Sequence, residues 1–133
     1  MRLPILFDDF KPGERLGETD LVYTTEFARQ WDGIFGAPEN ESERAARDAG
    51  IATAIMMRGY LSVVAPRPPG NVHARQNIVL SETPVQEERI RIAVSCVGKQ
   101  MRRDRRYVEL HVDGSGNGGR PICSGRMTLI WAC

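Results

Sequence analysis

The stretch from Phe27 to Glu41, FARQWDGIFGAPENE, holds the residues of this sequence that are best suited to acid–base chemistry. It carries the carboxyl groups of Asp32, Glu39 and Glu41, and it contains no histidine. Asp32 can take a proton from water, and Glu39 or Glu41 could supply one if the chain folds over a pocket. An exposed carboxyl group, however, has a pKa of about 4 and is a poor proton donor at neutral pH. The stretch therefore predicts a base without a matched acid, unless burial raises the pKa of one of the glutamates.

Two short helices are expected to position these carboxyl groups. The first covers residues 26 to about 34, with Thr24 or Thr25 as its cap. The second is polar, covers residues 41–48, begins at Asn40 with Glu43 as a capping partner, and ends at Gly50. The apolar face of the first helix consists of Phe27, Trp31 and Ile34, at the i, i+4, i+7 spacing.

A third helix is expected from Ile51 to about Ala65, in the segment IATAIMMRGYLSVVAP. It is apolar on nearly every face, and Arg58 is its only charged residue. This composition is typical of a helix that other structure surrounds.

Four strands are expected after this helix, with one more short strand near the segment DLVYT at residues 20–24. Their alternating apolar residues define inward faces. The inward residues are Ala74, Ile78 and Leu80 in the first strand, Ile90, Ile92, Val94 and Cys96 in the second, Val108, Leu110 and Val112 in the third, and Cys123, Met127, Leu129 and Trp131 in the fourth. A buried helix followed by an antiparallel meander predicts a single α+β domain over residues 1–133, in which the sheet wraps one helix.

The composition excludes several classes of protein. Hydrophobic residues make up 41% of the 133 residues and charged residues 26%, as in globular domains. The formal net charge of +1 gives no overall attraction to nucleic acid or membranes. The first ten residues lack the pattern of a signal peptide, and the three cysteines form no C-x-x-C pair. We therefore expect a cytoplasmic protein with reduced thiols, no metal and no cofactor.

The order of the motifs resembles MaoC-like hot-dog proteins, typified by (R)-specific enoyl-CoA hydratases. FDDFKPGERLG is similar to the opening segment of that family, and YTTEFARQWDG to the segment that leads into its active site. AGIATAIMMRGYLS is similar to the beginning of its central helix, and SETPVQEERIRIAVSCVGKQMR to its strand and hairpin. The resemblance spans nearly the whole chain and implies an α+β hot-dog fold, acyl-thioester ligands on coenzyme A or an acyl carrier, and no cofactor.

The resemblance also shows where this sequence departs from the family. The family's catalytic segment, Gly-Asp-x-Asn-Pro-x-His, provides an aspartate and a histidine that act on one water. Here Asp32 comes one residue early, Gly33 stands at the matching place, and the position of the histidine falls at Ala37 or Pro38. A second histidine of the family pattern aligns with Thr53. Asp32 is the one catalytic candidate that remains.

The resemblance implies a tunnel for the acyl group along the central helix. The substrate-binding candidates on that helix are Thr53, Met56, Met57, Arg58 and Tyr60. Arg58 has two interpretations: it holds a substrate, or it pairs with Asp32 or Glu26 because an unpaired charge in an apolar helix is costly.

Two loops carry weaker signals. The run KQMRRDRRY at residues 99–107 is typical of a solvated hairpin tip, and its functional interpretation is capture of coenzyme A phosphates by Arg102 and Arg103. RNA binding ranks last, because no aromatic residue besides Tyr107 accompanies the charges. The loop GSGNGG at residues 114–119 matches G-x-G-x-x-G, but a strand follows it, so we expect a hairpin rather than a dinucleotide site. His111 is expected on the solvated face of its strand.

Three hypotheses on function follow. The first is an acyl-thioester binding protein that lacks the hydratase pair, and the second is an active hydratase that uses displaced carboxylates. The third is a structural partner of an active hot-dog subunit. Thioester hydrolysis, which often uses a carboxylate on the central helix, is disfavoured because residues 51–65 contain none. The resemblance implies a homodimer formed through the strand at residues 72–81, and a heteromer with another hot-dog subunit is the alternative.

Overall fold

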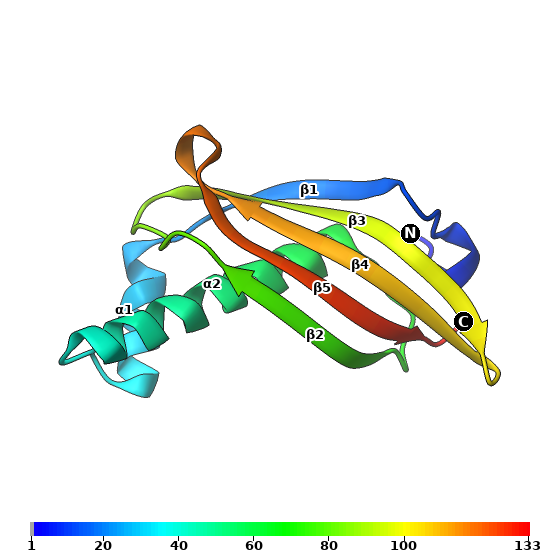
Figure 1. Ribbon diagram of the computed structural model, residues 1–133, viewed down its shortest axis with the longest axis horizontal. Coiled ribbons are helices and arrows are strands. Elements are labelled where there is room, and N and C mark those ends of the chain that lie inside the picture. The colour runs from blue at the N-terminus through cyan, green and yellow to red at the C-terminus, as the bar shows by residue number, and fades with distance from the viewer. Residues whose placement is uncertain (1) are drawn as a thin grey trace.

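The computed structural model describes residues 2–133 and has one sheet with two α-helices (Figure 1). No helix within these residues is long and apolar enough to span a membrane. The elements in chain order are η1 (Phe7–Asp9), β1 (Arg15–Val22), α1 (Thr25–Phe35), α2 (Glu41–Val63), β2 (Val72–Leu80), β3 (Arg89–Arg102), β4 (Arg105–Ser115), η2 (Asn117–Gly119) and β5 (Pro121–Trp131).

The sheet has five antiparallel strands in the order β1-β3-β4-β5-β2, and α2 lies across one of its faces (Figure 1). This arrangement confirms the predicted α+β hot-dog layout, in which the sheet wraps one long helix. The strand predicted at residues 72–81 is β2, and it forms an edge of the sheet. An open edge leaves one row of backbone N–H and C=O groups unpaired within the chain.

The central helix α2 is longer than the sequence predicts. The expected polar helix over residues 41–48 and the expected apolar helix from Ile51 form one continuous helix, so the predicted end at Gly50 is wrong. A Cβ at Gly50 would lie 2.6 Å from Cζ2 of Trp31. Gly50 therefore lets α1 approach α2 closely, and it does not act as a C-terminal cap. Asn40 begins the helix as predicted, since its Oδ1 accepts from the Glu43 N–H at 2.9 Å.

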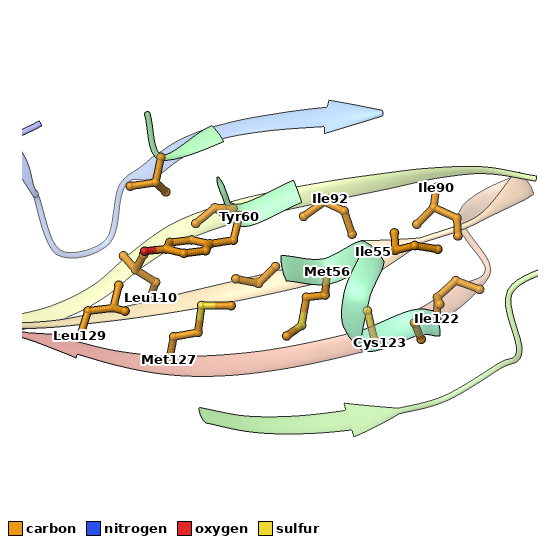
Figure 2. Packing of buried hydrophobic residues seen from close by; sticks show 14 of the residues in the cluster. Ile55, Met56, Tyr60, Ile90, Ile92, Leu110, Ile122, Cys123, Met127 and Leu129 are labelled. Atoms are coloured by element: carbon orange, nitrogen blue, oxygen red, sulfur yellow. The ribbon is translucent and has the colours of Figure 1, made fainter. Parts of the chain in front are cut away.

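The core lies between α2 and the sheet, and Figure 2 shows Ile55, Met56 and Tyr60 of α2 directed into this layer. The predicted inward residues of β3, β4 and β5 are buried, which confirms the alternation read from the sequence. Each fully buried Ile, Leu or Met side chain contributes roughly 1.5–3 kcal/mol to folding. The buried residues of these strands are Ile90, Ile92, Val94, Cys96, Val108, Leu110, Val112, Ile122, Cys123, Met127, Leu129 and Trp131.

The prediction for the inward face of β2 is only partly correct. Ile78 packs against the core, but Leu80 is 42% exposed because no further strand covers this edge. Ala74 is exposed because the register shifts between His73 and Arg75, which makes Ala74 the extra residue of a bulge.

Both predicted hairpins form. The β3–β4 turn uses Arg103 and Asp104, at φ of 52° and 62°. The glycine-rich loop joins β4 to β5, and its fold depends on the buried carboxylate of Glu88. That carboxylate accepts from the N–H groups of Val85 at 3.0 Å and Asn117 at 2.9 Å and from the guanidinium of Arg120.

Candidate functional site

The helix α1 and the start of α2 hold Asp32 in place. Thr24 caps α1, because its Oγ1 accepts from the N–H of Phe27 at 3.0 Å. The helix ends at Gly36, which has a φ of 88°. Residues 36–40 then lead directly into α2, so the carboxyl group of Asp32 lies beside the second turn of the next helix and next to Arg47.

Arg47 occupies both carboxylate oxygens of Asp32. Its Nε donates to Oδ1 at 2.7 Å and its Nη2 donates to Oδ2 at 2.9 Å, and the side chains are 17% and 26% exposed. The hydrogen bond to Asp32 raises the pKa of Arg47, which remains a cation. The bidentate pair fixes the orientation of this carboxylate against Arg47. The predicted base is therefore engaged.

An aromatic cavity of about 270 Å³ lies beside Pro38, one of the two positions at which the family resemblance leads us to expect a histidine. The rings of Trp31 and Phe35 stand 4.7 Å apart at their centroids, and Phe35 is 67% exposed. Glu43 is the carboxylate at this cavity, and its Oε2 accepts from the Asn40 side chain at 2.9 Å. The walls suit an apolar or flat group, and the polar side chains are already paired. The lining includes Trp31, Phe35, Pro38, Glu43, Ala46 and Arg47.

A second cavity, of about 130 Å³, lies on the other side of α2, against the segment that follows β2. Asp48 lines it and is 28% exposed. Among residues 2–133 its one ion-pair contact is to Nη1 of Arg47 at 4.0 Å. Asp48 thus keeps a carboxylate open to the cavity, which Asp32 does not. The other lining residues include Ala49, Ala52, Leu80, Ser81 and Thr83.

Tyr23 is a polar core residue that the sequence did not single out. Its hydroxyl is buried and makes no hydrogen bond within residues 2–133. Burial raises the pKa of this hydroxyl; the charge of Arg47 lowers it, and those of Asp48 and Asp32 raise it. The Tyr23 hydroxyl is therefore close enough to Arg47, Asp48 and Asp32 to interact with their charges.

Among the predicted central-helix residues, Met56 and Tyr60 face the sheet (Figure 2). Met56 is fully buried, and burial raises the pKa of Tyr60. Met57 is half-buried, while Arg58 is exposed. The hydroxyl of Thr53 donates to the carbonyl of Ala49 at 2.8 Å, so it is bonded to its own helix.

The structural interpretation of Arg58 as a partner of Asp32 or Glu26 is wrong. Asp32 is bound by Arg47, and Glu26 pairs with Arg29 at 2.9 Å. The Arg58 guanidinium instead lies 5.6 Å from the ring centroid of Phe27. A cation over an aromatic face is stabilised without a carboxylate, which explains how α2 carries this charge.

Arg102 and Arg103 lie at the β3–β4 hairpin, at the end of the sheet opposite α1 (Figure 1). The structure therefore does not bring them together with Asp32 in one chain. The histidines are also remote from Asp32. His73 packs against Tyr60, with ring centroids 6.4 Å apart, and His111 lies 3.2 Å from the Ser124 hydroxyl.

Comparisons with known proteins identify the fold. No family model matches the sequence, and no curated protein matches it at the significance required. Solved structures do match. The crystal structure of a MaoC-like dehydratase from Rhodospirillum rubrum is 14% identical, covers 96% of this chain and 97% of its own, and gives a TM-score of 0.77.

Two further structures support the same conclusion. Unliganded R-hydratase PhaJ1 from Pseudomonas aeruginosa is 11% identical, with 96% of this chain and 86% of that chain covered and a TM-score of 0.73. The ChsH1-ChsH2 complex from Mycobacterium tuberculosis is 12% identical over 91% of this chain and 98% of the matched chain, with a TM-score of 0.67. This chain thus has the hot-dog fold of MaoC-like dehydratases and (R)-hydratases.

Proposed function

We propose that this chain is a MaoC-like hot-dog protein that binds acyl thioesters of coenzyme A or an acyl carrier without hydrating them. The family motifs in their order and the shared fold support membership. The observation that carries the functional proposal is the bidentate pair between Asp32 and Arg47. In this proposal the pair engages the one base left of the family motif, in which Ala37 or Pro38 stands at the position of the histidine.

Ligand binding does not need the missing acid–base pair. The aromatic cavity offers the rings of Trp31 and Phe35 to an acyl group, and burial of apolar surface alone drives such binding. Met57 and Arg58 are the proposed contacts on α2; Arg58 is exposed, and Met57 is half-buried against the core. The proposed setting is the cytoplasm, with Cys96, Cys123 and Cys133 as free thiols.

The experiment that tests binding is calorimetric titration with butyryl-CoA, butyryl-pantetheine and free pantetheine. The proposal predicts that both acyl thioesters bind and that pantetheine binds much more weakly. Trp31→Ala should weaken both thioesters by about tenfold, because it removes one wall of the cavity. Equal binding of all three compounds, or of none, contradicts the proposal, and absence of binding favours the role of a structural partner.

Hydration by displaced carboxylates is the weaker alternative. Glu39 and Glu41 are exposed, and neither lines the aromatic cavity. Asp32, the other group of this route, is already in a bidentate pair with Arg47.

Thioester hydrolysis is a second candidate, and one observation favours it. The sequence argument against it assumed a central helix without a carboxylate, but the helix begins at Glu41 and carries Asp48 at a cavity. We propose Asp48 as the base or nucleophile in this case. Release of free thiol from acyl-CoA that Asp48→Asn abolishes, while butyryl-CoA binding persists, would establish it. No release by the wild type would refute it.

We propose further that the chain forms a homodimer through the open edge of β2. Val72 and Val79 on this strand are 52% and 60% exposed, and natural proteins rarely leave an apolar edge strand uncovered. A heteromer is the alternative, and the ChsH1-ChsH2 complex is a precedent for this fold. Light scattering of the purified chain tests this: a dimer supports self-pairing, and a monomer favours another partner.

A further inference from the structure

A cavity of about 520 Å³ lies on the outer face of the sheet, away from α2. Val108 of β4 is fully buried beneath α2, so its neighbours Tyr107 and Glu109 point to the opposite face. Both of these residues line the cavity, together with Arg75 and Arg102. Its volume lies within the range of small-molecule sites. The thioester proposal, which concerns α1 and α2, does not use it.

Two β-bulges shape this cavity. The register shifts in β2 between His73 and Arg75, and in β3 between Cys96 and Gly98. After its bulge, Arg75 stands opposite Thr128 on the outer face. Bulges re-aim side chains and occur often next to functional sites. The bulges in β2 and β3 thus direct side chains from two separate strands toward the same cavity.

The cavity has an excess of uncommitted positive charge. Within residues 2–133, neither Arg75 nor Arg102 forms an ion pair or a side-chain hydrogen bond. Lys99 also lines it, but its ammonium donates to the carbonyl of Phe7 at 3.1 Å. Glu109 is the one acid of the lining, and Arg126 lies 4.0 Å from it. Two free guanidinium forks favour an anion with several oxygens, such as a phosphate.

Two other lining residues, Tyr107 and Glu109, indicate which kind of anion the cavity would bind. Tyr107 is half-buried and lines the cavity, and an aromatic ring is a side chain on which a planar base can stack. A carboxylate such as Glu109 repels a bare phosphate, but it accepts hydrogen bonds from the hydroxyl groups of a ribose. An arrangement of cations, an aromatic ring and one carboxylate therefore fits a nucleotide better than an inorganic anion.

We propose that this cavity binds a nucleoside diphosphate group, with Arg75 and Arg102 on the phosphates, Tyr107 on the base and Glu109 on the ribose. Arg102, which the sequence assigned to coenzyme A phosphates, takes part here in a site on the outer face of the sheet, apart from the two cavities beside α2. The group is either a free nucleotide or the nucleotide end of coenzyme A. A dimer formed through the edge of β2 leaves the site intact, because Arg75 projects from the face of that strand.

The test is calorimetric titration of the wild-type chain with ADP, 3′-phospho-ADP, adenosine and inorganic pyrophosphate. We expect ADP or 3′-phospho-ADP to bind at least about tenfold more tightly than adenosine or pyrophosphate. Tighter binding of 3′-phospho-ADP assigns the site to coenzyme A, and tighter binding of ADP assigns it to a free nucleotide. Either result supports the proposal.

Substitutions then locate the binding. Arg75→Gln and Arg102→Gln should each weaken the nucleotide about tenfold or more, and Tyr107→Ala about fivefold or more. Arg89→Gln is the matched control, because Arg89 is an exposed cation at the other end of β3 that pairs with Asp20 at 3.9 Å. It should leave the affinity within about twofold.

Three results overturn the proposal. They are absence of nucleotide binding, pyrophosphate binding as tight as that of the nucleotide, and unchanged affinity in both arginine variants. None of these three results bears on the proposal of thioester binding, because butyryl-pantetheine tests that proposal and contains no nucleotide.

Discussion

Arg47 holds both carboxylate oxygens of Asp32, at 2.7 and 2.9 Å, across the interface between α1 and α2. The two residues are 15 positions apart, and both are mostly shielded from solvent. The pair therefore joins two helices and at the same time engages the carboxylate that we propose as the remnant of the family's catalytic pair.

Removing Arg47 should destabilise the fold. We expect Arg47→Gln to lower the free energy of unfolding by about 1–3 kcal/mol, less than for a fully buried pair because both side chains keep some exposure. Urea denaturation measures this. Arg44→Gln, an exposed cation on the same helix, is the control and should change stability by less than about 0.5 kcal/mol. Equal effects of the two substitutions would show that the pair has no structural role.

Two glycine-to-alanine substitutions should change the stability of the fold in opposite directions. Gly50→Ala places a methyl group 2.6 Å from the Trp31 ring and should destabilise by about 1–3 kcal/mol. Gly33→Ala in α1 meets no atom within 4 Å and should stabilise by about 0.5–1 kcal/mol, because alanine is the better helix former. Thermal unfolding of both variants checks this. A stabilising Gly50→Ala would mean that α1 does not pack on α2 in this way.

The contribution of Glu88 should depend on pH. Burial acts to raise the pKa of Glu88, but the hydrogen bonds from Arg120, Asn117 and Val85 outweigh it, and the pKa lies below its ordinary value of 4.5. A lowered folded-state pKa gives stability that is complete above the unfolded-state pKa and is lost as pH falls through the folded-state pKa. Glu88→Gln should therefore be less stable than wild type at pH 7.

The difference in stability between wild type and Glu88→Gln should shrink as pH falls below about 4.5. Urea denaturation across that range measures it, and Glu14→Gln, which changes an exposed carboxylate without an ion pair among residues 2–133, is the comparison. If the stability difference between wild type and Glu88→Gln instead grew as pH falls, Glu88 would not have a lowered pKa in the folded protein.

The buried face of α2 should not tolerate a charge. Ile55→Asp places an unpaired carboxylate in the core, where Ile55 is 4% exposed, and should abolish the soluble folded protein. Ser42→Asp, an exposed change in the first turn of α2, is the control and should leave the protein folded. Circular dichroism and size-exclusion chromatography distinguish the two. A folded Ile55→Asp protein with unchanged melting temperature would contradict the hot-dog assignment.

Local patterns account for what the sequence predicts correctly. The cap at Thr24, the cap at Asn40 and the alternation of β3 to β5 depend on residues a few positions apart, and all are present. The end of the helix at Gly50 was predicted wrongly because a glycine after a polar helix usually ends it. Here the glycine is needed because the ring of Trp31, from another helix, leaves no room for a side chain.

The parts of the site that the sequence missed depend on tertiary contacts. Nothing near Arg47 in the sequence signals that its partner is Asp32, and Tyr23 meets the same charges from the end of β1. The bulge at Ala74 shifts which residues of β2 face the core, and period-two alternation does not reveal it. The predicted site residues Arg102 and Arg103 lie far from Asp32 because β3 carries the hairpin to the opposite end of the sheet.

Hydration of crotonyl-CoA, measured alongside its binding, tests the central claim most directly. We predict that the wild-type chain binds crotonyl-CoA but hydrates it no faster than background, because Arg47 engages Asp32 and no histidine stands beside it. One positioned acid or base is worth roughly 100- to 10,000-fold in rate, so loss of the pair should be decisive. Efficient hydration by the wild type that Asp32→Asn removes without unfolding the protein would contradict the claim.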